Sequence, residues 1–176
     1  MRFVMSYLKP LLLGLSLLSL TALAHSAAQN IPTLDGQVYI QSERAKQAYD
    51  QWHFAPARSS GDLVFFSGVI AAAPAEGADT ELFKKNLRHA FGNLETLLKQ
   101  AGLGTEHVVK INSYHLFNSP LFKGTKEQHV AAVMAVKDEF FKAPYPAWTA
   151  VGVAELFADQ GLVEIEIIAR KPAAKP

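Results

Sequence analysis

The clearest hydrophobic pattern in the chain lies between residues 80 and 101. Apolar residues recur there at spacings of three and four, which places them on one stripe of an amphipathic helix. They are Phe83, Leu87, Ala90, Phe91, Leu94, Leu97, Leu98 and Ala101. Asp79 or Thr80 can cap the start of this helix, and Gly102 suits a left-handed residue just beyond its end. The pattern therefore predicts a helix that buries one face.

A second helix is predicted to begin at Thr125. Residues 125–128 read TKEQ, a capping box in which the threonine and the glutamine bond each other's backbone. The residues expected to form its buried stripe are Val130, Val133, Val136, Phe140 and Phe141. Two prolines follow at 144 and 146 and end the helix, because proline cannot continue it.

Four segments have the composition of β-strands, with many β-branched and aromatic residues. They are residues 62–71, 107–117, 147–154 and 162–170, and residues 36–40 are a weaker candidate for a short edge strand. A turn-like ADQG at 158–161 predicts that the last two strands pair as a hairpin. The order of strands and helices predicts an α+β domain in which two helices pack on one face of a mixed sheet.

The last strand indicates what the other face of the sheet is like. Val163, Ile165 and Ile167 alternate toward the helices, whereas Leu162, Glu164, Glu166 and Ile168 alternate toward the opposite side. A face that is half apolar and half acidic is a candidate subunit interface.

The first residues have the pattern of a secretory signal peptide. Arg2 and Lys9 precede a leucine-rich uncharged run at 11–24, and small residues follow it. The run is shorter than the roughly 20 apolar residues that a membrane span needs. Cleavage is expected after Ala24, Ser26 or Ala28, with Ser26 preferred, although an uncleaved anchor stays an alternative. We therefore expect a signal peptide at 1–26, a domain at 27–170, a disordered tail at 171–176, and a periplasmic protein that is not attached to the membrane after cleavage.

Composition narrows the possible chemistry. The chain has 176 residues and no cysteine, which excludes disulfides, thiolate catalysis and cysteine-ligated metals. The leader takes two of the 17 basic residues and none of the 16 acidic ones, so the remaining body is nearly neutral and offers no basic patch for nucleic acid. The six histidines are scattered without an HExxH pattern, so no metal site is predicted.

Several motifs together resemble the RidA family, also called YjgF or L-PSP. They are GDLVFFSG at 61–68, NLETLL at 93–98 followed by Ala101-Gly102, VVK at 108–110, PAWT at 146–149 and VEIEIIA at 163–169. The resemblance covers nearly all of the body after the leader. It implies a chorismate-mutase-like fold and a homotrimer in which three sheets form a central barrel, with ligand pockets in the clefts between subunits. Well-understood members hydrolyse reactive enamines and imines, such as 2-aminoacrylate, to 2-keto acids and ammonia. No cofactor is expected.

Matched position by position, this chain lacks much of the family's ligand-binding set. Trp148 stands where the family has the arginine that holds a substrate carboxylate. Phe54 replaces a pocket tyrosine, Met134 an asparagine, and Ala150 a residue that is often cysteine. Each of the first three changes removes a hydrogen-bond donor and adds apolar surface.

Two family positions are kept, Ser67 and Glu164. Glu164 is the candidate catalytic residue, as an acid that activates water, and Ser67 is a candidate ligand contact. Alternatively, Glu164 is a hydrogen-bonded carboxylate where the three subunits meet, and the Ser67 hydroxyl only makes a hydrogen bond to nearby backbone. Arg58 and Lys110 are candidates to replace the lost cation, and Arg58 is preferred because it lies between Phe54 and Ser67 in the chain.

The changed positions also have two interpretations each. Trp148 either lines a ligand cleft or plugs it, and Phe54 and Met134 either line the pocket or only pack. His115 is the histidine most able to reach the pocket, with core or surface placement as its alternatives.

These observations favour a small-molecule-binding protein without the standard 2-imino acid deaminase activity. One alternative is an enamine or imine deaminase, a hydrolase, whose carboxylate-binding group has moved elsewhere. Another is a structural or chaperone-like protein with plugged clefts.

Overall fold

The computed structural model describes residues 28–173. The predicted signal peptide at 1–26 lies outside the described residues, as does the end of the predicted tail at 174–176. Within the described part, none of the helices has both the length and the hydrophobicity that a membrane crossing requires.

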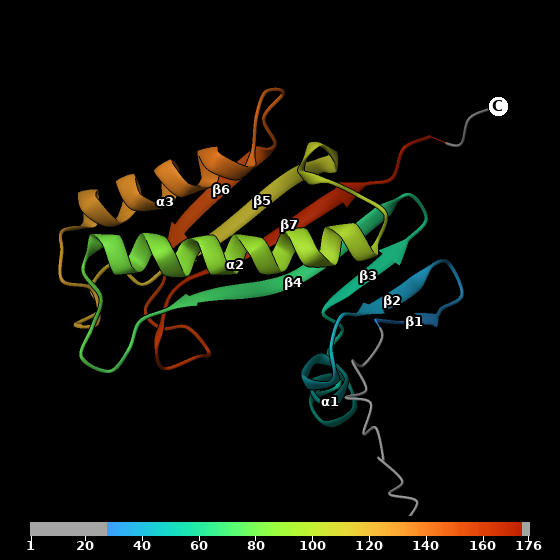
Figure 1. Cartoon of the computed structure of the whole chain (residues 1–176), viewed down its shortest axis with the longest axis horizontal. Helices are drawn as coiled ribbons and strands as arrows, with labels where there is room; N and C mark the ends of the chain where they lie inside the picture. The colour runs from blue at the N-terminus through green and yellow to red at the C-terminus, as the bar shows by residue number, and fades with distance from the viewer. Residues whose placement is uncertain (1–27, 174–176) are drawn as a thin grey trace, which may run out of the picture.

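A single seven-stranded sheet forms the centre of the fold (Figure 1). Its strands in chain order are β1 Gln29–Pro32, β2 Gln37–Ile40, β3 Ala57–Ser60, β4 Leu63–Ala72, β5 Val108–His115, β6 Ala147–Gly152 and β7 Gly161–Arg170. Their order across the sheet is β1-β2-β3-β4-β7-β5-β6. All neighbouring pairs are antiparallel except β5 and β6, which makes the sheet mixed, as predicted.

Two long helices, α2 (Thr80–Gln100) and α3 (Lys126–Phe140), lie side by side over one face of the sheet (Figure 1). This confirms the predicted α+β architecture. A third helix, α1 (Glu43–Trp52), lies apart from them near the β1–β2 end (Figure 1). The predicted elements did not include α1, β1 or β3. A single turn of 3-10 helix at Thr105–His107 precedes β5.

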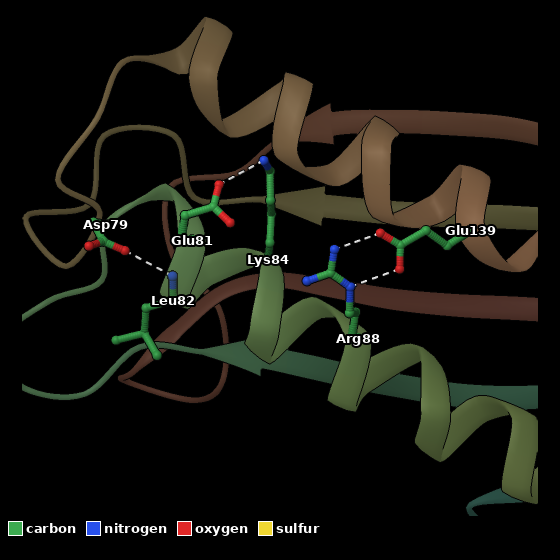
Figure 2. A network of polar contacts seen from close by, with 6 residues as sticks. All are labelled: Asp79, Glu81, Leu82, Lys84, Arg88 and Glu139. Carbon is green, nitrogen blue, oxygen red and sulfur yellow. Dashed lines mark hydrogen bonds and ion pairs between the residues drawn. The ribbon is translucent and has the colours of Figure 1, made fainter.

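Helix α2 follows its sequence pattern closely. Seven residues of the predicted stripe are buried, and they belong to the main core. Asp79 caps the start, since its Oδ1 accepts a hydrogen bond from the backbone N–H of Leu82 at 2.8 Å (Figure 2). Gly102 has φ +73°, the left-handed conformation expected just after the helix.

Helix α3 begins with the predicted capping box. The Thr125 hydroxyl accepts from the Gln128 backbone N–H, and the Gln128 side chain accepts from the Thr125 N–H at 2.8 Å. An exposed ion pair joins the two long helices (Figure 2). Arg88 Nε donates to Glu139 Oε2 at 2.8 Å, and Arg88 Nη2 donates to Glu139 Oε1 at 2.6 Å. Fork-to-carboxylate pairing of this kind fixes the orientation of the two groups.

The strand pairing differs from the prediction at two places. β6 and β7 do not form a hairpin, because β5 lies between them and β6 runs parallel to β5 at the sheet edge. The reason is that β5, α3 and β6 form a crossover unit, which brings the following strand alongside in parallel. The short strand predicted at 36–40 is present as β2, but it is not an edge strand, because β1 and β3 pair with it on either side.

The two faces of β7 differ largely as the alternation predicts. Val163, Ile165 and Ile167 are buried in the core beneath the helices, while Glu164 and Glu166 are only partly buried on the opposite, open face. Leu162 departs from the pattern because it is fully buried at the end where the register of β4 against β7 becomes irregular.

Candidate functional site

A cavity of about 230 Å³ lies between α1 and an irregularity in β4. Phe66 pairs with Ile167 and Val69 with Ile165. Between these two pairs β4 has two residues, 67 and 68, whereas β7 has only one, residue 166. This bulge carries Ser67 and Gly68, and both line the cavity. The remaining lining residues are Gln41, Ser42, Arg44, Ala45, Ala48, Phe54, Pro56, Val69 and Leu97.

Two of the predicted ligand-binding residues, Phe54 and Ser67, meet in this cavity. His53 adopts a left-handed conformation (φ 55°) that ends α1 and turns the chain toward Phe54. The Ser67 hydroxyl donates a hydrogen bond to the backbone carbonyl of Ala55 at 2.6 Å, which fixes the side chain beside Phe54. The Ser67 oxygen keeps acceptor capacity for a ligand, since a hydroxyl accepts as well as donates.

Glu164 lies against the same bulge from the open face of the sheet. A Cβ built on Gly68 would lie 2.0 Å from Glu164 Oε1, so only the absence of a side chain at position 68 lets the carboxylate occupy this place. Burial raises the pKa of Glu164, and the nearby charge of Glu166 adds to the effect. Glu164 also lines a second hollow of about 310 Å³, together with Tyr114, Glu155 and Glu166 among others.

The neighbouring carboxylate, Glu166, is bound to two donors. Its Oε1 accepts from Asn112 Nδ2 at 2.7 Å and from the Tyr114 hydroxyl at 3.1 Å. Burial raises the pKa of Tyr114, and the hydrogen bond to Glu166 raises it further. Glu164, by contrast, makes no hydrogen bond within residues 28–173. Of the two acids, Glu164 is therefore the one whose oxygens are free for water or a ligand.

Trp148 lies on the other side of the sheet, beneath α3. It pairs in register with Ile111, a core residue, and its indole N–H donates to Ser113 Oγ at 2.8 Å. Lys137 Nζ lies 5.3 Å from the centre of the indole ring, a cation–π contact. A single chain therefore does not bring Trp148 and Glu164 together.

Two other predicted residues also lie outside the cavity. Met134 is on an exposed side of α3. Arg58 is exposed on β3, where its guanidinium lies 3.7 Å from the carboxylate of Asp35. Arg58 therefore does not line this cavity, and its role as the replacement cation in a cleft between subunits stays a prediction.

Arg44 does line the cavity, and the sequence reasoning missed it. Residues 43–52 were not predicted to form a helix, although the sequence contains two signals for one. Ser42 is typical of an N-cap, and Ala45, Ala48, Tyr49 and Trp52 recur at helical spacing. Nothing in the sequence indicates that this helix lies beside the cavity that Phe54 lines.

A chain of buried polar groups extends from Trp148 under α3. The second partner of Ser113 Oγ is His115 Nε2 at 2.8 Å, and His115 Nδ1 lies 3.2 Å from His129 Nε2. Burial lowers the pKa of both imidazoles to about 4. His115 is thus a core residue, not a pocket residue. Over the described residues no three or more metal-ligand side chains gather into a site.

Comparisons with known proteins point to one family. The model of the family described as Endoribonuclease L-PSP matches residues 44–171. The RutC family protein YjgH of Escherichia coli is 35% identical over 125 residues, 70% of this chain and 87% of that protein. A 2-iminobutanoate/2-iminopropanoate deaminase of Dermatophagoides farinae is 31% identical over 65% of this chain and 83% of its own length.

Solved structures agree with the sequence comparisons. The structure of protein YJGH matches with a TM-score of 0.56 at 34% identity, covering 72% of this chain and 89% of that one. RidA from an Antarctic Psychrobacter matches with a TM-score of 0.53 at 27% identity, covering 66% of this chain and 87% of that one.

Proposed function

The chain belongs to the Endoribonuclease L-PSP family, the RidA/YjgF family, and from this premise we propose that it is a small-molecule-binding protein without the standard 2-imino acid deaminase activity. The family includes a 2-iminobutanoate/2-iminopropanoate deaminase, so the proposed loss is a departure within the family.

The observation that carries this proposal is the position of Trp148. A carboxylate substrate needs a cationic fork, which arginine supplies and tryptophan does not. The single N–H of the indole is already bound to Ser113, and its ring is covered by Lys137. Position 148 therefore has nothing left with which to hold an anion.

The cavity beside Phe54 supports binding in place of the standard chemistry. Its wall is mostly apolar with a few polar groups, which is how small-molecule sites are usually built. Its volume of about 230 Å³ suits a compact ligand. In this proposal Phe54 and Ser67 contact the ligand directly, while Trp148 and Met134 border the cleft from a neighbouring subunit.

A homotrimer is part of the proposal. Phe65 pairs with Ile168 and Val151 with Tyr114, so all four lie on the open face that also carries Glu164. Phe65 is 44% exposed and Val151 41% exposed. Large apolar side chains of this kind favour a subunit interface, and three such sheets would form the barrel that the family resemblance implies.

The proposed location is the periplasm, reached through the signal peptide at 1–26 and without a membrane anchor afterwards. The nearly neutral charge of the rest of the chain argues against a nucleic-acid partner.

The deciding experiment generates 2-aminoacrylate beside the purified protein and follows the release of keto acid. We expect release at the uncatalysed rate for the wild type. Release as fast as that of a deaminase relative assayed in parallel would contradict the proposal. Trp148→Arg is the companion variant, because a gain of activity would mean that the rest of the site still operates.

Enamine or imine hydrolysis with a relocated carboxylate-binding group is the second candidate. Arg44 lines the same cavity as Ser67, and the Glu164 carboxylate with its raised pKa lies against the cavity residue Gly68. Glu164 would take a proton from water as the oxygen bonds to the imine carbon. That proton would then pass to nitrogen, which gives a carbinolamine. When the hydroxyl proton of the carbinolamine also moves to nitrogen, the C–N bond breaks, the C=O bond forms, and ammonia and the keto acid are released. Loss of all turnover in Glu164→Gln would favour this candidate.

A further inference from the structure

The buried polar chain under α3 determines where its own hydrogens lie. The indole N–H of Trp148 only donates, so Ser113 Oγ accepts it and still has its own hydrogen to give. The remaining partner of Ser113 Oγ within residues 28–173 is His115 Nε2, at 2.8 Å, so the hydroxyl donates to this nitrogen. His115 then carries its ring proton on Nδ1, which donates to His129 Nε2 at 3.2 Å. His129 carries its own proton on Nδ1.

The reverse arrangement of protons leaves more buried groups unpaired. If His115 Nε2 donated to Ser113, the hydroxyl hydrogen would have no acceptor among the described residues, and His129 Nδ1 would be an unprotonated nitrogen without a donor. In the first arrangement only the Nδ1–H of His129 is unpaired. It lies among three phenylalanine rings, whose faces are weak acceptors for an N–H. Because unpaired buried groups are costly, the first arrangement is the stable one.

Neither imidazole can take a further proton without losing a contact. The two ring nitrogens that lack a proton, His115 Nε2 and His129 Nε2, each already accept a hydrogen bond. A proton on His129 Nε2 would set two N–H groups against each other across 3.2 Å. A proton on His115 Nε2 would turn the Ser113 hydroxyl away and leave its hydrogen unpaired. Ser113 and both histidines are at most 2% exposed, so solvent does not reach them to compensate.

The surroundings keep both imidazoles neutral at pH 7. Burial lowers both pKa values to about 4, and no carboxylate within residues 28–173 pairs with either ring. The charged side chains nearest to the chain are Lys126, Lys137 and the Asp138 that pairs with Lys137. Lys126 Nζ lies 4.9 Å from the centre of the Phe117 ring, which stacks on His115. Lys137 Nζ lies 5.3 Å from the ring of Trp148. Both cations oppose a further positive charge.

The outer end of this chain attaches the edge strand β6 to the core. Five of the six residues of β6 are exposed, and Trp148 alone is partly buried and packs against the main core. Within the described residues β6 pairs with β5 on one side and has no strand on the other. Loss of the bond between Trp148 and Ser113 therefore weakens the main side-chain attachment of this strand.

From this geometry we propose that the chain of four groups is a pH-sensitive lock on strand β6. With both imidazoles neutral the lock holds Trp148 against the core, and one added proton releases Trp148 while the helices stay folded. The lock does not depend on the proposed function. In that proposal Trp148 borders the ligand cleft, so acid would also loosen this wall of the cleft.

Fluorescence of Trp148 tests the release. The chain has two tryptophans, so Trp52→Phe leaves Trp148 as the single emitter. We expect its emission to shift to longer wavelength as the pH falls from about 7 toward about 4, before far-UV circular dichroism shows any loss of helix. Adding Ser113→Ala separates the indole from His115, so this early shift should disappear. A shift that coincides with the loss of helix, or that persists in Ser113→Ala, overturns the lock.

Nitrogen-15 NMR of the wild-type imidazoles tests the lock without a substitution in the chain. The ring-nitrogen signals show which nitrogen carries the proton in each histidine. At about pH 7 we expect the Nδ1–H form for both His115 and His129. The Nε2–H form in both would overturn the lock, because His129 Nδ1 would then take up a proton without breaking any contact.

Discussion

The indole N–H of Trp148 donates a hydrogen bond to the hydroxyl of Ser113, with 2.8 Å between Nε1 and Oγ. Ser113 is buried, at 2% exposure, and its oxygen also bonds His115. Trp148 thus connects the edge strand β6 to the polar core under α3. Trp148 therefore has a structural role that is independent of the ligand-binding role of the arginine that stands at this position in the family.

Replacing Trp148 by phenylalanine tests that role. Trp148→Phe keeps an aromatic ring but removes the donor, so we expect the free energy of unfolding to fall by about 1 kcal/mol, the usual net value of one hydrogen bond. Urea unfolding measures the change. Trp52→Phe is the control, because Trp52 is 63% exposed and should change stability by less than about 0.5 kcal/mol. Equal losses in the two variants would contradict the structural role.

The His115–His129 pair predicts a loss of stability in mild acid. Burial lowers both pKa values to about 4, below the value of about 6.5 expected in the unfolded chain. Between these values the unfolded chain binds protons that the folded chain excludes, so stability is full above pH 6.5 and falls as the pH drops toward 4. We expect a loss of roughly 4 kcal/mol between pH 7 and pH 5, about 2 kcal/mol for each imidazole, from urea unfolding at both pH values.

Single substitutions identify the groups responsible for this acid sensitivity. His129 lies among the aromatic rings of Phe83, Phe117 and Phe122, at centroid distances of 4.6 to 5.3 Å, and His129→Phe should reduce the pH dependence. Its stability at pH 7 should fall, because His115 loses its partner and the larger ring must fit a fully buried site. His89 is exposed on α2, and His89→Gln should leave the dependence as it is. An unchanged slope in His129→Phe would assign the effect to other groups.

Sequence reasoning predicted the elements whose local pattern of residues is sufficient to identify them. The stripe of α2, the capping box of α3 and the alternation of β7 all depend on residues near one another in the chain, and the structure has all three. Helix α1 was missed although Ala45, Ala48, Tyr49 and Trp52 recur in it at helical spacing, because this stripe is short and only Ala45 is buried. The wrong hairpin depends on distant contacts, since β7 is separated from β6 by a strand that comes much earlier in the chain.

The residues of the candidate site also fall into two groups, those that the sequence identifies and those that only tertiary contacts identify. Phe54 and Ser67 were proposed from their matched positions, and the β4 bulge brings them together. Arg58 and Arg44 could not be told apart by residue type. What separates them is the side chain of Asp35, which meets Arg58, and the orientation of a helix that carries Arg44 to the cavity.

Glu164 and Glu166 should respond oppositely to the same substitution. The raised folded-state pKa of Glu164 means that its charge destabilises the folded protein at pH 7, and this cost disappears as the pH falls through that pKa. Glu164→Gln should therefore raise the urea midpoint at pH 7. Glu166→Gln should lower it, because two charge-assisted hydrogen bonds become weaker neutral ones. The comparison needs equal protein concentrations, since subunit association also affects stability. A lower midpoint in both variants would mean that Glu164 has a stabilising partner.

The contact between Gly68 and Glu164 gives the sharpest structural prediction. A methyl group on Gly68 would meet Glu164 Oε1 at 2.0 Å, so Gly68→Ala must push the carboxylate away and should cost about 1–2 kcal/mol. Truncating the acid makes room for the methyl, so in a double-mutant cycle Gly68→Ala should cost much less in a Glu164→Ala background than in the wild type. Gly92→Ala is the control, because nothing lies within 4 Å of its added methyl in the middle of α2 and the substitution should stabilise the protein by about 0.5–1 kcal/mol. Additive losses at 68 and 164 would show that the carboxylate does not occupy the bulge, and Glu164 would then lose its place beside the ligand cavity.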